Sequence, residues 1–157
     1  MIVTPAALEH REGWLALRAA LWGEEAGDPA ELPDGDGHFV ALADGRVIGF
    51  AEATVRTDYV NGCDGSPVLF LEGLFVDPAR RRHGVARALV AAVAQWGRAQ
   101  GCAEFASDAE LENVDSHAMH RALGFVETER VVYFRRELAN AASHPPHQKR
   151  DGLTTAR

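Results

Sequence analysis

Residues 70–90 read FLEGLFVDPARRRHGVARALV, and this stretch decides the fold. It begins inside a strongly apolar run, Val68 to Val76, which predicts a strand that is buried on both faces. Glu72 and Gly73 interrupt the run, and a glycine inside a strand is typical of a bulge or of a close approach by another group. Asp77-Pro78 then marks the end of the strand.

A basic loop and a helix follow this strand. The loop reads RRRHG over residues 80–84, and an apolar stripe predicts a helix from about Val85 to Gln100. The first turn of a helix has backbone N–H groups without an intrahelical partner and favours negative charge. Because Gly84 and Ala86 have little side chain, the pattern R/Q-x-x-G-x-G/A predicts a pyrophosphate site, with the arginines as further contacts. The alternative is a solvated basic turn that only caps the helix.

The rest of the chain predicts short strands and helices around this unit. Asp44-Gly45 is a strong signal for a two-residue hairpin, and Gly23 to Gly37 predicts a loop. We expect strands at residues 2–4, 38–43, 46–57, 68–76, 104–107, 125–127 and 130–138, and helices that begin at Pro5, at Val85 and at Asn113 or Asp115. This order predicts an α/β (α+β) domain over residues 1–138, with a mixed, mostly antiparallel sheet flanked by helices and a central β-loop-α unit. Residues 139–157 predict a disordered tail.

The composition disfavours several classes of protein. A length of 157 residues fits one domain, and a net charge of -7 argues against nucleic-acid binding. The sequence predicts no membrane span and no secretory signal. Cys63 and Cys102 form no spaced motif and predict free thiols in a reducing cytoplasm. The patterns G-x-x-x-x-G-K-S/T and G-x-G-x-x-G do not occur, so P-loop and dinucleotide-binding folds are disfavoured.

Charge is distributed unevenly along the chain. Residues 1–78 contain 14 acidic and 4 basic residues, whereas residues 79–157 contain 9 acidic and 12 basic ones. The first half suits a cationic ligand and the second an anionic one, although the halves of a sequence need not form separate faces. The acidic residues in or beside predicted loops, which would attract a polycation, are Asp28, Glu31, Asp34, Asp36, Asp58 and Asp64.

The segment Asn113-x-x-Ser116-x-x-x-His120-x-x-x-Gly124-Phe125 follows the basic loop at the spacing of a second cofactor-binding strand and helix. With it, residues 2–138 resemble the GNAT family of N-acetyltransferases. The resemblance implies acetyl-CoA as co-substrate, no metal, and direct transfer in a ternary complex, with the oxyanion bound by a strand N–H near Leu74 or Phe75. His120 occupies the place of a tyrosine that often protonates the leaving thiolate. The cofactor-binding residues that the resemblance implies are Leu74, Phe75, Val76, Arg81, Arg82, His83, Gly84, Val85, Ala86 and Asn113.

Other segments resemble, more narrowly, the chromosomally encoded aminoglycoside 6′-N-acetyltransferases within this family. The resemblance implies acetylation of a 6′-amine, antibiotic resistance and a homodimer. It also implies acceptor contacts by Trp22, Tyr59, Glu72, Asp108 and Glu129. The segments that carry it are AALW at 19–22, YVNGC at 59–63, SPV at 66–68, FLEG at 70–73, ASD at 106–108, MH at 119–120 and ETERV at 127–131.

Glu72 and Asp108 are the candidate catalytic carboxylates, and His120 is the third candidate. A lone charge inside an apolar strand is costly, so Glu72 needs a ligand or a neighbour such as Arg56 as its partner. Asp108 closes the next predicted strand, where it either faces the acceptor or caps a turn. If the two strands separate beside the bulge, both carboxylates face the acceptor amine. Trp22 is either an acceptor contact or a core anchor.

Two other functions remain open from the sequence. A GNAT-like enzyme alternatively acetylates a polyamine, another amino-sugar or a protein amine. The chain is alternatively a non-catalytic sensor that binds acyl-CoA. His117 and His120 do not predict a metal site, because no convincing third ligand follows them.

Overall fold

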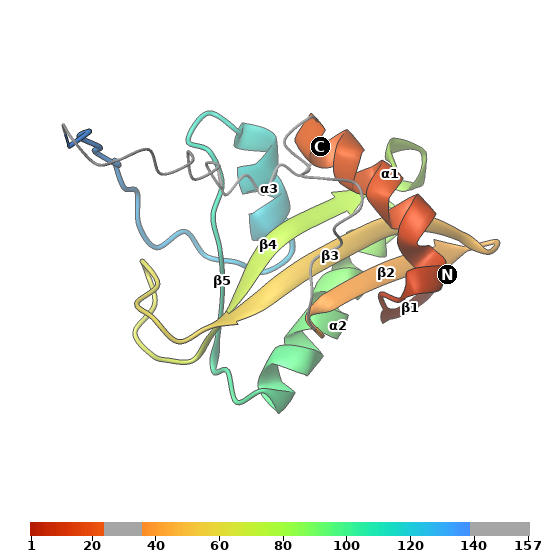
Figure 1. Ribbon diagram of the computed structural model, residues 1–157, viewed down its shortest axis with the longest axis horizontal. Helices are drawn as coiled ribbons and strands as arrows, with labels where there is room; N and C mark the ends of the chain where they lie inside the picture. The colour runs from red at the N-terminus through yellow and green to blue at the C-terminus, as the bar shows by residue number, and fades with distance from the viewer. Residues whose placement is uncertain (24–35, 139–157) are drawn as a thin grey trace.

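The computed structural model describes residues 1–23 and 36–138. Figure 1 shows a central sheet with α1 on one face and α2 on the opposite face. The five strands follow sequence order, all neighbours being antiparallel except β4 and β5, which are parallel. This confirms the mixed, mostly antiparallel α/β fold. The elements are β1 (Ile2–Pro5), α1 (Arg11–Trp22), β2 (His38–Ala43), β3 (Arg46–Arg56), β4 (Val68–Val76), α2 (Val85–Ala99), β5 (Glu104–Ser107) and α3 (Val114–Ala122), with 3-10 turns at Leu8–His10 and Pro78–Arg80.

Each face of the sheet has its own apolar core. One core joins the sheet to the apolar stripe of α2, and the other joins it to α1, so the two amphipathic helices fix the sheet between them. The fully or nearly buried residues of the α2 side include Leu69, Leu71, Leu74, Val76, Leu89 and Val93, and those of the α1 side are Trp14, Val40, Phe50 and Phe75.

The hairpin between β2 and β3 turns at the predicted pair. Asp44 has a φ of 51° and Gly45 a φ of 72°. Both angles lie in the left-handed region that a tight two-residue hairpin requires, and glycine, aspartate and asparagine adopt it most readily.

β4 contains the bulge that its sequence predicts. Glu52 and Ala53, which are consecutive in β3, pair with Gly73 and Leu71 of β4, so Glu72 stands outside the register. One additional residue reverses the alternation of side chains along a strand. The residues of β4 that pack on the α2 side are accordingly Leu69 and Leu71 before the bulge, and Leu74 and Val76 after it.

β4 and β5 pair only along their first residues. Their parallel register begins at Val68 with Glu104 and ends at Leu71 with Ser107. β4 continues to Val76, whereas β5 ends at Ser107. Among the described residues, the remaining part of β4 therefore has no strand neighbour on its β5 side.

The first helix begins later than predicted. Pro5 is the last residue of β1, where it pairs with Phe39 of β2, and α1 begins only at Arg11. Proline is tolerated in an edge strand such as β1. The chain then makes a 3-10 turn, in which the Ala7 N–H donates to His10 Nδ1 at 3.1 Å.

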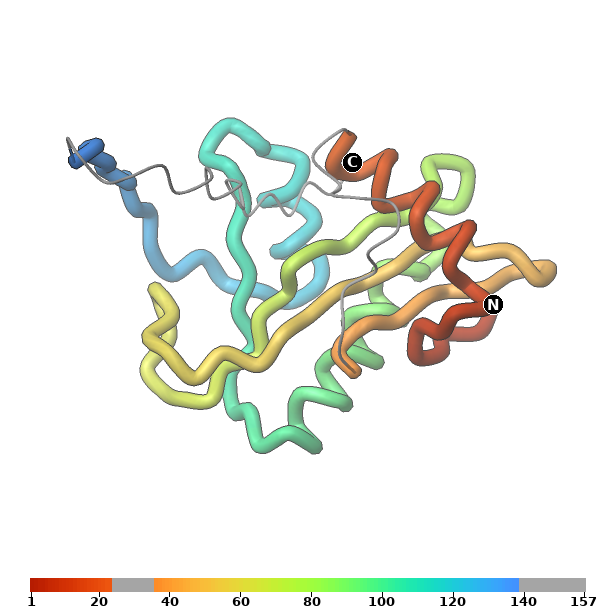
Figure 2. Tube along the Cα trace, in the orientation of Figure 1, coloured from red at the N-terminus to blue at the C-terminus, as the bar shows by residue number. Residues whose placement is uncertain are grey.

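The predicted strands at residues 125–127 and 130–138 are wrong for the described structure. The chain after α3 leads away from the sheet and pairs with no described strand (Figure 2). Val132, Tyr133 and Phe134 are 77%, 82% and 94% exposed. The β-propensity of such a segment reflects its fit to a neighbouring pleated surface, so an alternating sequence without that neighbour stays unpaired.

Two predictions concern residues beyond the described ones. Most of the predicted loop at Gly23–Gly37, with the acidic residues Asp28, Glu31 and Asp34, and the predicted tail at 139–157 lie outside the described residues. Within residues 1–23 and 36–138, no helix is long and apolar enough to cross a membrane.

Candidate active site

The loop between β4 and α2 presents backbone N–H groups at a helix start. Gly84 precedes α2 with a φ of 79°, a conformation that glycine adopts without strain. The first α-helical hydrogen bond runs from the Ala88 N–H to the Gly84 carbonyl at 3.0 Å, so the N–H groups of Val85, Ala86 and Arg87 precede this ladder. Gly84 is exposed and offers no side-chain cap. The site therefore has the donors and the dipole that bind an anionic group.

The arginines of this loop have different tasks. Arg81 fastens the loop to β4, because its Nε donates to the Val76 carbonyl at 3.2 Å and its guanidinium carbon lies 5.6 Å from the centre of the Phe75 ring. His83 Nδ1 lies 2.6 Å from the Arg81 carbonyl oxygen, which accepts. Arg82 and His83 are exposed. Arg81 thus organises the turn, while Arg82 and His83 are accessible to a phosphate.

Leu74, Phe75 and Val76 contribute backbone rather than side chains to the site. Their side chains are buried in the two cores. The backbone N–H and C=O groups of a strand point to its edges, and the β5-side edge of β4 is open beyond Leu71. This edge offers main-chain donors and acceptors to an extended ligand, as an added strand would use them.

Glu72 is held by two residues of β3. Thr54 Oγ1 donates to Glu72 Oε1 at 2.5 Å, and Arg56 Nη2 lies 2.9 Å from each carboxylate oxygen. The Arg56 guanidinium carbon in turn lies 3.4 Å from the centre of the Phe70 ring. Pairing of Glu72 with Arg56, one of the two sequence alternatives, is therefore confirmed. The Glu72 side chain keeps 23% exposure, so this pairing does not remove it from solvent.

Asp108 is the first residue after β5 and interacts with the same pair of charges. Partial burial of the carboxyl has the largest effect and raises the pKa of Asp108 to about 6, while Arg56 lowers this pKa and Glu72 raises it. The residue as a whole is exposed, so its carboxyl is both partly desolvated and accessible. A carboxylate of this pKa is ionised at neutral pH and suited to accept a proton. The structure thus gathers Glu72 and Asp108 where β4 and β5 separate.

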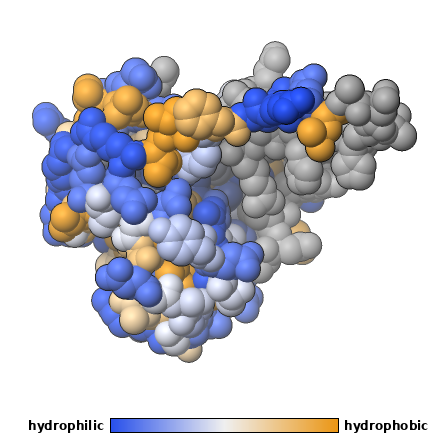
Figure 3. Space-filling model, turned by 90° about the vertical axis from the view of Figure 1, so that its left-hand side faces the viewer, coloured by the Kyte–Doolittle hydropathy of each residue, from blue (hydrophilic) through white to orange (hydrophobic). Residues whose placement is uncertain are grey.

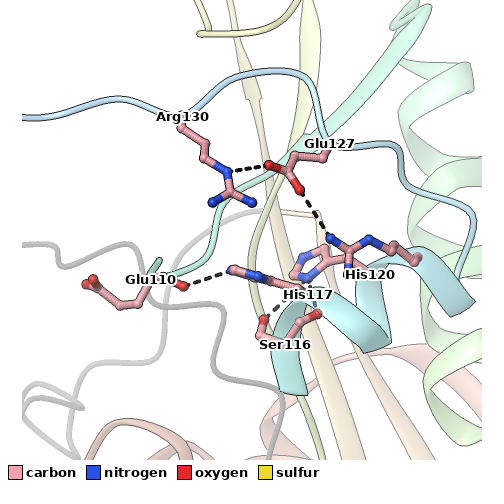
Figure 4. Close-up of polar contacts among 7 residues, drawn as sticks. Glu110, Ser116, His117, His120, Glu127 and Arg130 are labelled. Atoms are coloured by element: carbon pink, nitrogen blue, oxygen red, sulfur yellow. Dashed lines mark hydrogen bonds and ion pairs between the residues drawn. The ribbon is translucent and has the colours of Figure 1, made fainter. Parts of the chain in front are cut away.

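His120 lies on α3 beside the end of β5. Its Nδ1 is 2.8 Å from the Ser116 carbonyl oxygen, as Figure 4 shows, and its Nε2 is 3.0 Å from Ser107 Oγ. A carbonyl only accepts, so Nδ1 carries the proton and Nε2 of the neutral ring accepts from Ser107. Burial lowers the pKa of His120, which favours this neutral form. The imidazole is therefore arranged to orient Ser107, and in this form its Nε2 has no proton to give to a thiolate.

The predicted aromatic acceptor contacts differ in their surroundings. Trp22 is half-buried at the end of α1, and its ring centre lies 5.7 Å from that of Phe50, so it packs on the core as one sequence alternative expects. It also covers the bulge, because a Cβ added to Gly73 would lie 2.5 Å from the indole Cζ2. Tyr59 is 78% exposed on the loop between β3 and β4. Glu129 is exposed in the segment after α3.

The chain is similar to known proteins over most of its length. The model of the acetyltransferase (GNAT) family matches residues 6–125. The chain belongs to the acetyltransferase (GNAT) family. It is 52% identical over 135 residues to the aminoglycoside N(6′)-acetyltransferase type 1 of Salmonella enteritidis, a match that covers 81% of this chain and 92% of the relative. It is also 52% identical over 136 residues to the protein of the same name from Stenotrophomonas maltophilia, covering 82% and 88% of the two chains.

Solved structures of GNAT enzymes agree with these relatives. AAC(6′)-Iy in complex with the bisubstrate analog CoA-S-monomethyl-acetylneamine is 48% identical and superposes with a TM-score of 0.79, covering 87% of this chain and 98% of that one. The aminoglycoside antibiotic 6′-N-acetyltransferase AAC(6′)-Ih from Acinetobacter baumannii is 44% identical with a TM-score of 0.81, and the match covers the same shares.

Asn113 serves the fold of this GNAT domain at the start of α3. Its Oδ1 accepts from the Ser116 N–H at 3.0 Å, which caps the helix. The cap leaves the Asn113 side-chain NH2 group for the cofactor contact that the sequence predicts. On the same helix, His117 Nε2 lies 2.9 Å from the Glu110 carbonyl oxygen (Figure 4). The described part of the chain holds no group of three histidine, cysteine or acidic residues that could bind a metal ion.

Ion pairs connect α3 to the segment that follows it. Glu127 accepts from Arg121 Nη2 at 3.1 Å and from Arg130 Nε at 2.5 Å (Figure 4). These bonds lower the pKa of Glu127 and fix the beginning of the segment that carries Glu129. No hydrogen bond or ion pair within the described ranges joins Tyr59 or Glu129 to the two site carboxylates.

Sequence reasoning missed one charged group of the GNAT site region, Glu52 of β3. Its side chain is buried, accepts from Trp14 Nε1 at 2.8 Å and lies 2.9 Å from Arg18 Nε. The signal was available, because Glu52 is a lone charge in the apolar stretch 47–53, just as Glu72 is in β4. Its partners, Trp14 and Arg18, lie on α1, far away in the sequence, and no local sequence pattern predicts these contacts.

Proposed function

We propose that this chain is an acetyl-CoA-dependent N-acetyltransferase that acetylates the 6′-amine of an aminoglycoside and thereby confers antibiotic resistance. The observation that carries the proposal is the position of Glu72 and Asp108. Both carboxylates lie where β4 and β5 separate, at the beginning of an open strand edge that ends at the N-terminus of α2. One arrangement therefore joins an anionic acceptor site to a backbone site for an extended, phosphate-bearing ligand.

The residues of this chain fit acetyl-CoA from two ends. The N–H groups of Val85 and Ala86, with Arg82 and His83, suit its pyrophosphate. The open edge of β4 at Leu74 to Val76 suits the amides of its pantetheine arm. When bound, acetyl-CoA supplies the acetyl thioester, and its thiol end then lies toward Glu72. The structure of AAC(6′)-Iy, which is 48% identical to this chain and is a complex with a CoA-based bisubstrate analog, supports this assignment.

The acceptor side of the site binds an ammonium group and removes its proton. Glu72 and Asp108 hold the cationic amine, and Asp108 takes one proton from it, directly or through a water. The free amine nitrogen then forms its bond to the thioester carbonyl carbon while a backbone N–H near Leu74 or Phe75 donates to the developing oxyanion. The C–S bond breaks in a direct transfer, the thiolate takes a proton from solvent, and the new amide nitrogen releases its second proton to solvent. His120 supports Ser107 in this scheme, since its Nε2 accepts.

Two alternative functions compete with this proposal: acetylation of a different amine, and binding of acyl-CoA without any acetyl transfer. The same fold can acetylate another polyamine, an amino-sugar or a protein amine, and a sensor would bind acyl-CoA without transferring the acetyl group. The aminoglycoside is favoured because relatives named for its acetylation are 52% identical over most of this chain. The sensor is disfavoured because Glu72, Arg56 and Asp108 form an intact charged group beside the open edge.

The test is release of free CoA from acetyl-CoA by the purified protein. We expect turnover with aminoglycosides that carry a 6′-amine, and none with a matched drug that carries a 6′-hydroxyl. Turnover only with a polyamine or a peptide amine would contradict the acceptor and keep the reaction. Binding of acetyl-CoA without turnover in a broad amine panel would support the sensor instead.

We also propose that the enzyme is a homodimer. Val132, Tyr133 and Phe134 have the pattern of a strand, are almost fully exposed and pair with no described strand, while β5 leaves one edge of the sheet open. Figure 3 shows apolar side chains at the surface on this side of the molecule. A second copy of the chain would cover both the exposed segment and the open sheet edge. In such a dimer, the segment of each copy pairs with the edge of the partner's sheet.

Light scattering tests the dimer. We expect a mass of twice the 17.0 kDa of one chain, and monomers for a Val132→Asp/Phe134→Asp variant. Leu8→Asp is the matched control, because Leu8 is 81% exposed on another part of the surface. A monomeric wild type would overturn the dimer without affecting the proposed reaction.

The proposal includes a domain boundary and a location. The catalytic domain spans residues 1–138, and 139–157 is a dispensable tail, so a chain that ends at Leu138 should keep full activity. We assign the enzyme to the cytoplasm because Cys63 and Cys102 are free thiols. Cell fractionation that follows the CoA-releasing activity tests this location.

A further inference from the structure

Glu52 carries a buried charge between α1 and the acceptor side of the sheet. The residue is 4% exposed. Its Oε1 accepts from Trp14 Nε1 at 2.8 Å and lies 2.9 Å from Arg18 Nε, whose side chain is 14% exposed. A buried carboxylate is costly unless it is paired and hydrogen-bonded, and a buried ion pair rarely stabilises a fold more than apolar residues of the same volume. The pair therefore calls for an explanation other than stability.

Arg18 extends this contact to the bulge in β4. Its guanidinium carbon lies 5.1 Å from the centre of the Trp22 ring. Trp14, Arg18 and Trp22 are spaced four residues apart, so they lie on one face of α1. The Trp22 indole occupies the space over Gly73 that a side chain would fill, with Cζ2 only 2.5 Å from the place of an added Cβ. A continuous series of contacts thus runs from Glu52 through Arg18 and Trp22 to the residue after Glu72.

Glu52 also lies on the same face of β3 as the residues that hold Glu72. Side chains two residues apart in a strand share a face, which places Glu52, Thr54 and Arg56 in one row. Thr54 and Arg56 bond to Glu72, whereas Glu52 bonds to the helix. The charge of Glu72 acts on Glu52, so the two carboxylates are within electrostatic reach of each other. Glu52 is the point at which α1 and the acceptor site meet.

We propose that Glu52 and Arg18 are positioning residues for the amine acceptor: their ion pair holds the Trp22 indole against Gly73 and so forms a fixed wall beside Glu72. Indole faces bind cations, and a rigid wall next to a carboxylate selects a bulky, cationic ring system over a flexible amine. The inference rests on the proposed function, in which the acceptor binds beside Glu72 and Asp108. It adds two residues that act on the acceptor only through Trp22.

Steady-state kinetics of four variants and one control variant test the positioning. At pH 8, above the pKa of about 7 of Glu52, Glu52→Gln should raise KM for an aminoglycoside about tenfold. In the same variant, kcat and KM for acetyl-CoA should stay within about twofold, because the cofactor side is built from other elements. Glu52→Asp keeps the charge and should recover most of the loss. Trp22→Ala should raise the same KM, and adding Glu52→Gln to it should have no further effect, because residues that act through one another are not additive. Glu12→Gln, an exposed residue of α1, is the control for loss of one negative charge.

The emission of Trp22 gives a readout that does not depend on turnover. Its contribution is the difference between a protein and its Trp22→Phe counterpart. Removing the charge of Glu52 should shift this contribution to longer wavelength and make it more accessible to acrylamide. An unchanged Trp22 emission, additive effects in the double variant, or an equal rise of KM for both substrates would overturn the inference. A wild type that binds acetyl-CoA but acetylates no aminoglycoside, with the emission shift still present, would reject the proposed function and leave the indole positioning standing.

Discussion

The site has a cofactor side, formed by backbone groups, and an acceptor side, formed by charged side chains. On the proposed cofactor side, the decisive groups belong to the backbone: the N–H groups after Gly84 and the open edge of β4. On the proposed acceptor side they are the charged side chains of Glu72, which Arg56 binds, and Asp108. Backbone groups are the same for every residue, so the cofactor side depends on conformation. Side-chain charges depend on identity, so the acceptor side changes with single substitutions.

The largest expected effect comes from neutralising the carboxylates of the acceptor side while the cofactor side is left unchanged. A Glu72→Gln/Asp108→Asn variant loses both the ammonium contacts and the proton acceptor. Positioned acid–base groups contribute about 10²–10⁴-fold, so we expect kcat/KM for the aminoglycoside to fall by that order while the Kd for acetyl-CoA stays unchanged. Calorimetric titration and CoA release measure the two quantities. A similar loss in Asp58→Asn, which removes an exposed charge from the neighbouring loop, would instead indicate a general effect of net charge.

The converse experiment disturbs the cofactor side through its conformation. Gly84 has a φ of 79° and open space around an added Cβ, and Gly45 of the β2–β3 hairpin has a φ of 72° and the same open space. An alanine strains the backbone by about 1–2 kcal/mol at either position. We expect both variants to lose similar stability, but only Gly84→Ala to raise KM for acetyl-CoA, by about tenfold. An equal rise in Gly45→Ala would show that strain anywhere in the domain has this effect.

The buried carboxyl of Glu52, beside the acceptor side, should make the free energy of unfolding depend on pH. Burial outweighs the attraction of Arg18 and raises the pKa of Glu52 from 4.5 to about 7. Between these two values the folded chain keeps a proton that the unfolded chain releases, so this group makes the free energy of unfolding decrease as pH rises from about 5 to 7. Between pH 5 and pH 7, the free energy of unfolding of the wild type should decrease by about 1–2 kcal/mol more than that of Glu52→Gln. Urea unfolding at pH 5 and pH 7 measures the difference. A difference between the two proteins that is independent of pH would contradict it.

The smallest expected effect is on the pH dependence of turnover. The pKa of Asp108 is raised to about 6, so its basic form is lost as pH falls through that value. At pH 5.5 we expect kcat/KM for the acceptor to be about a quarter of its value at neutral pH, with the acidic limb missing from Asp108→Asn. The Kd for acetyl-CoA should show no such limb. A limb near pH 6 that survives in Asp108→Asn would assign the titration to another group.

The sequence predicts the cofactor side better than the acceptor side, and the reason is physical. The run from Val68 to Val85 is local, so periodicity, one glycine and a helix start are enough to predict the strand, the bulge and the loop. The proximity of Glu72 and Asp108 depends on where β4 and β5 stop pairing. The sequence therefore predicts it only on the condition that the two strands separate beside the bulge. The pair of Glu52 with Arg18 depends on how a helix lies on the sheet, and it was missed. Residues 130–138 have strand character, yet they pair with no strand of the described chain.

The bulge at Glu72 has a consequence for how such an enzyme changes under antibiotic selection. Glu72 stands outside the register of β3 and β4 and belongs to neither apolar core, and β4 reverses its alternation on either side of it. A mutation there alters the charge offered to a drug without opening a cavity in either core. A substitution at position 72 therefore acts on its pairing with Thr54 and Arg56 and on the charge of the site, while the side chains of both apolar cores stay in place.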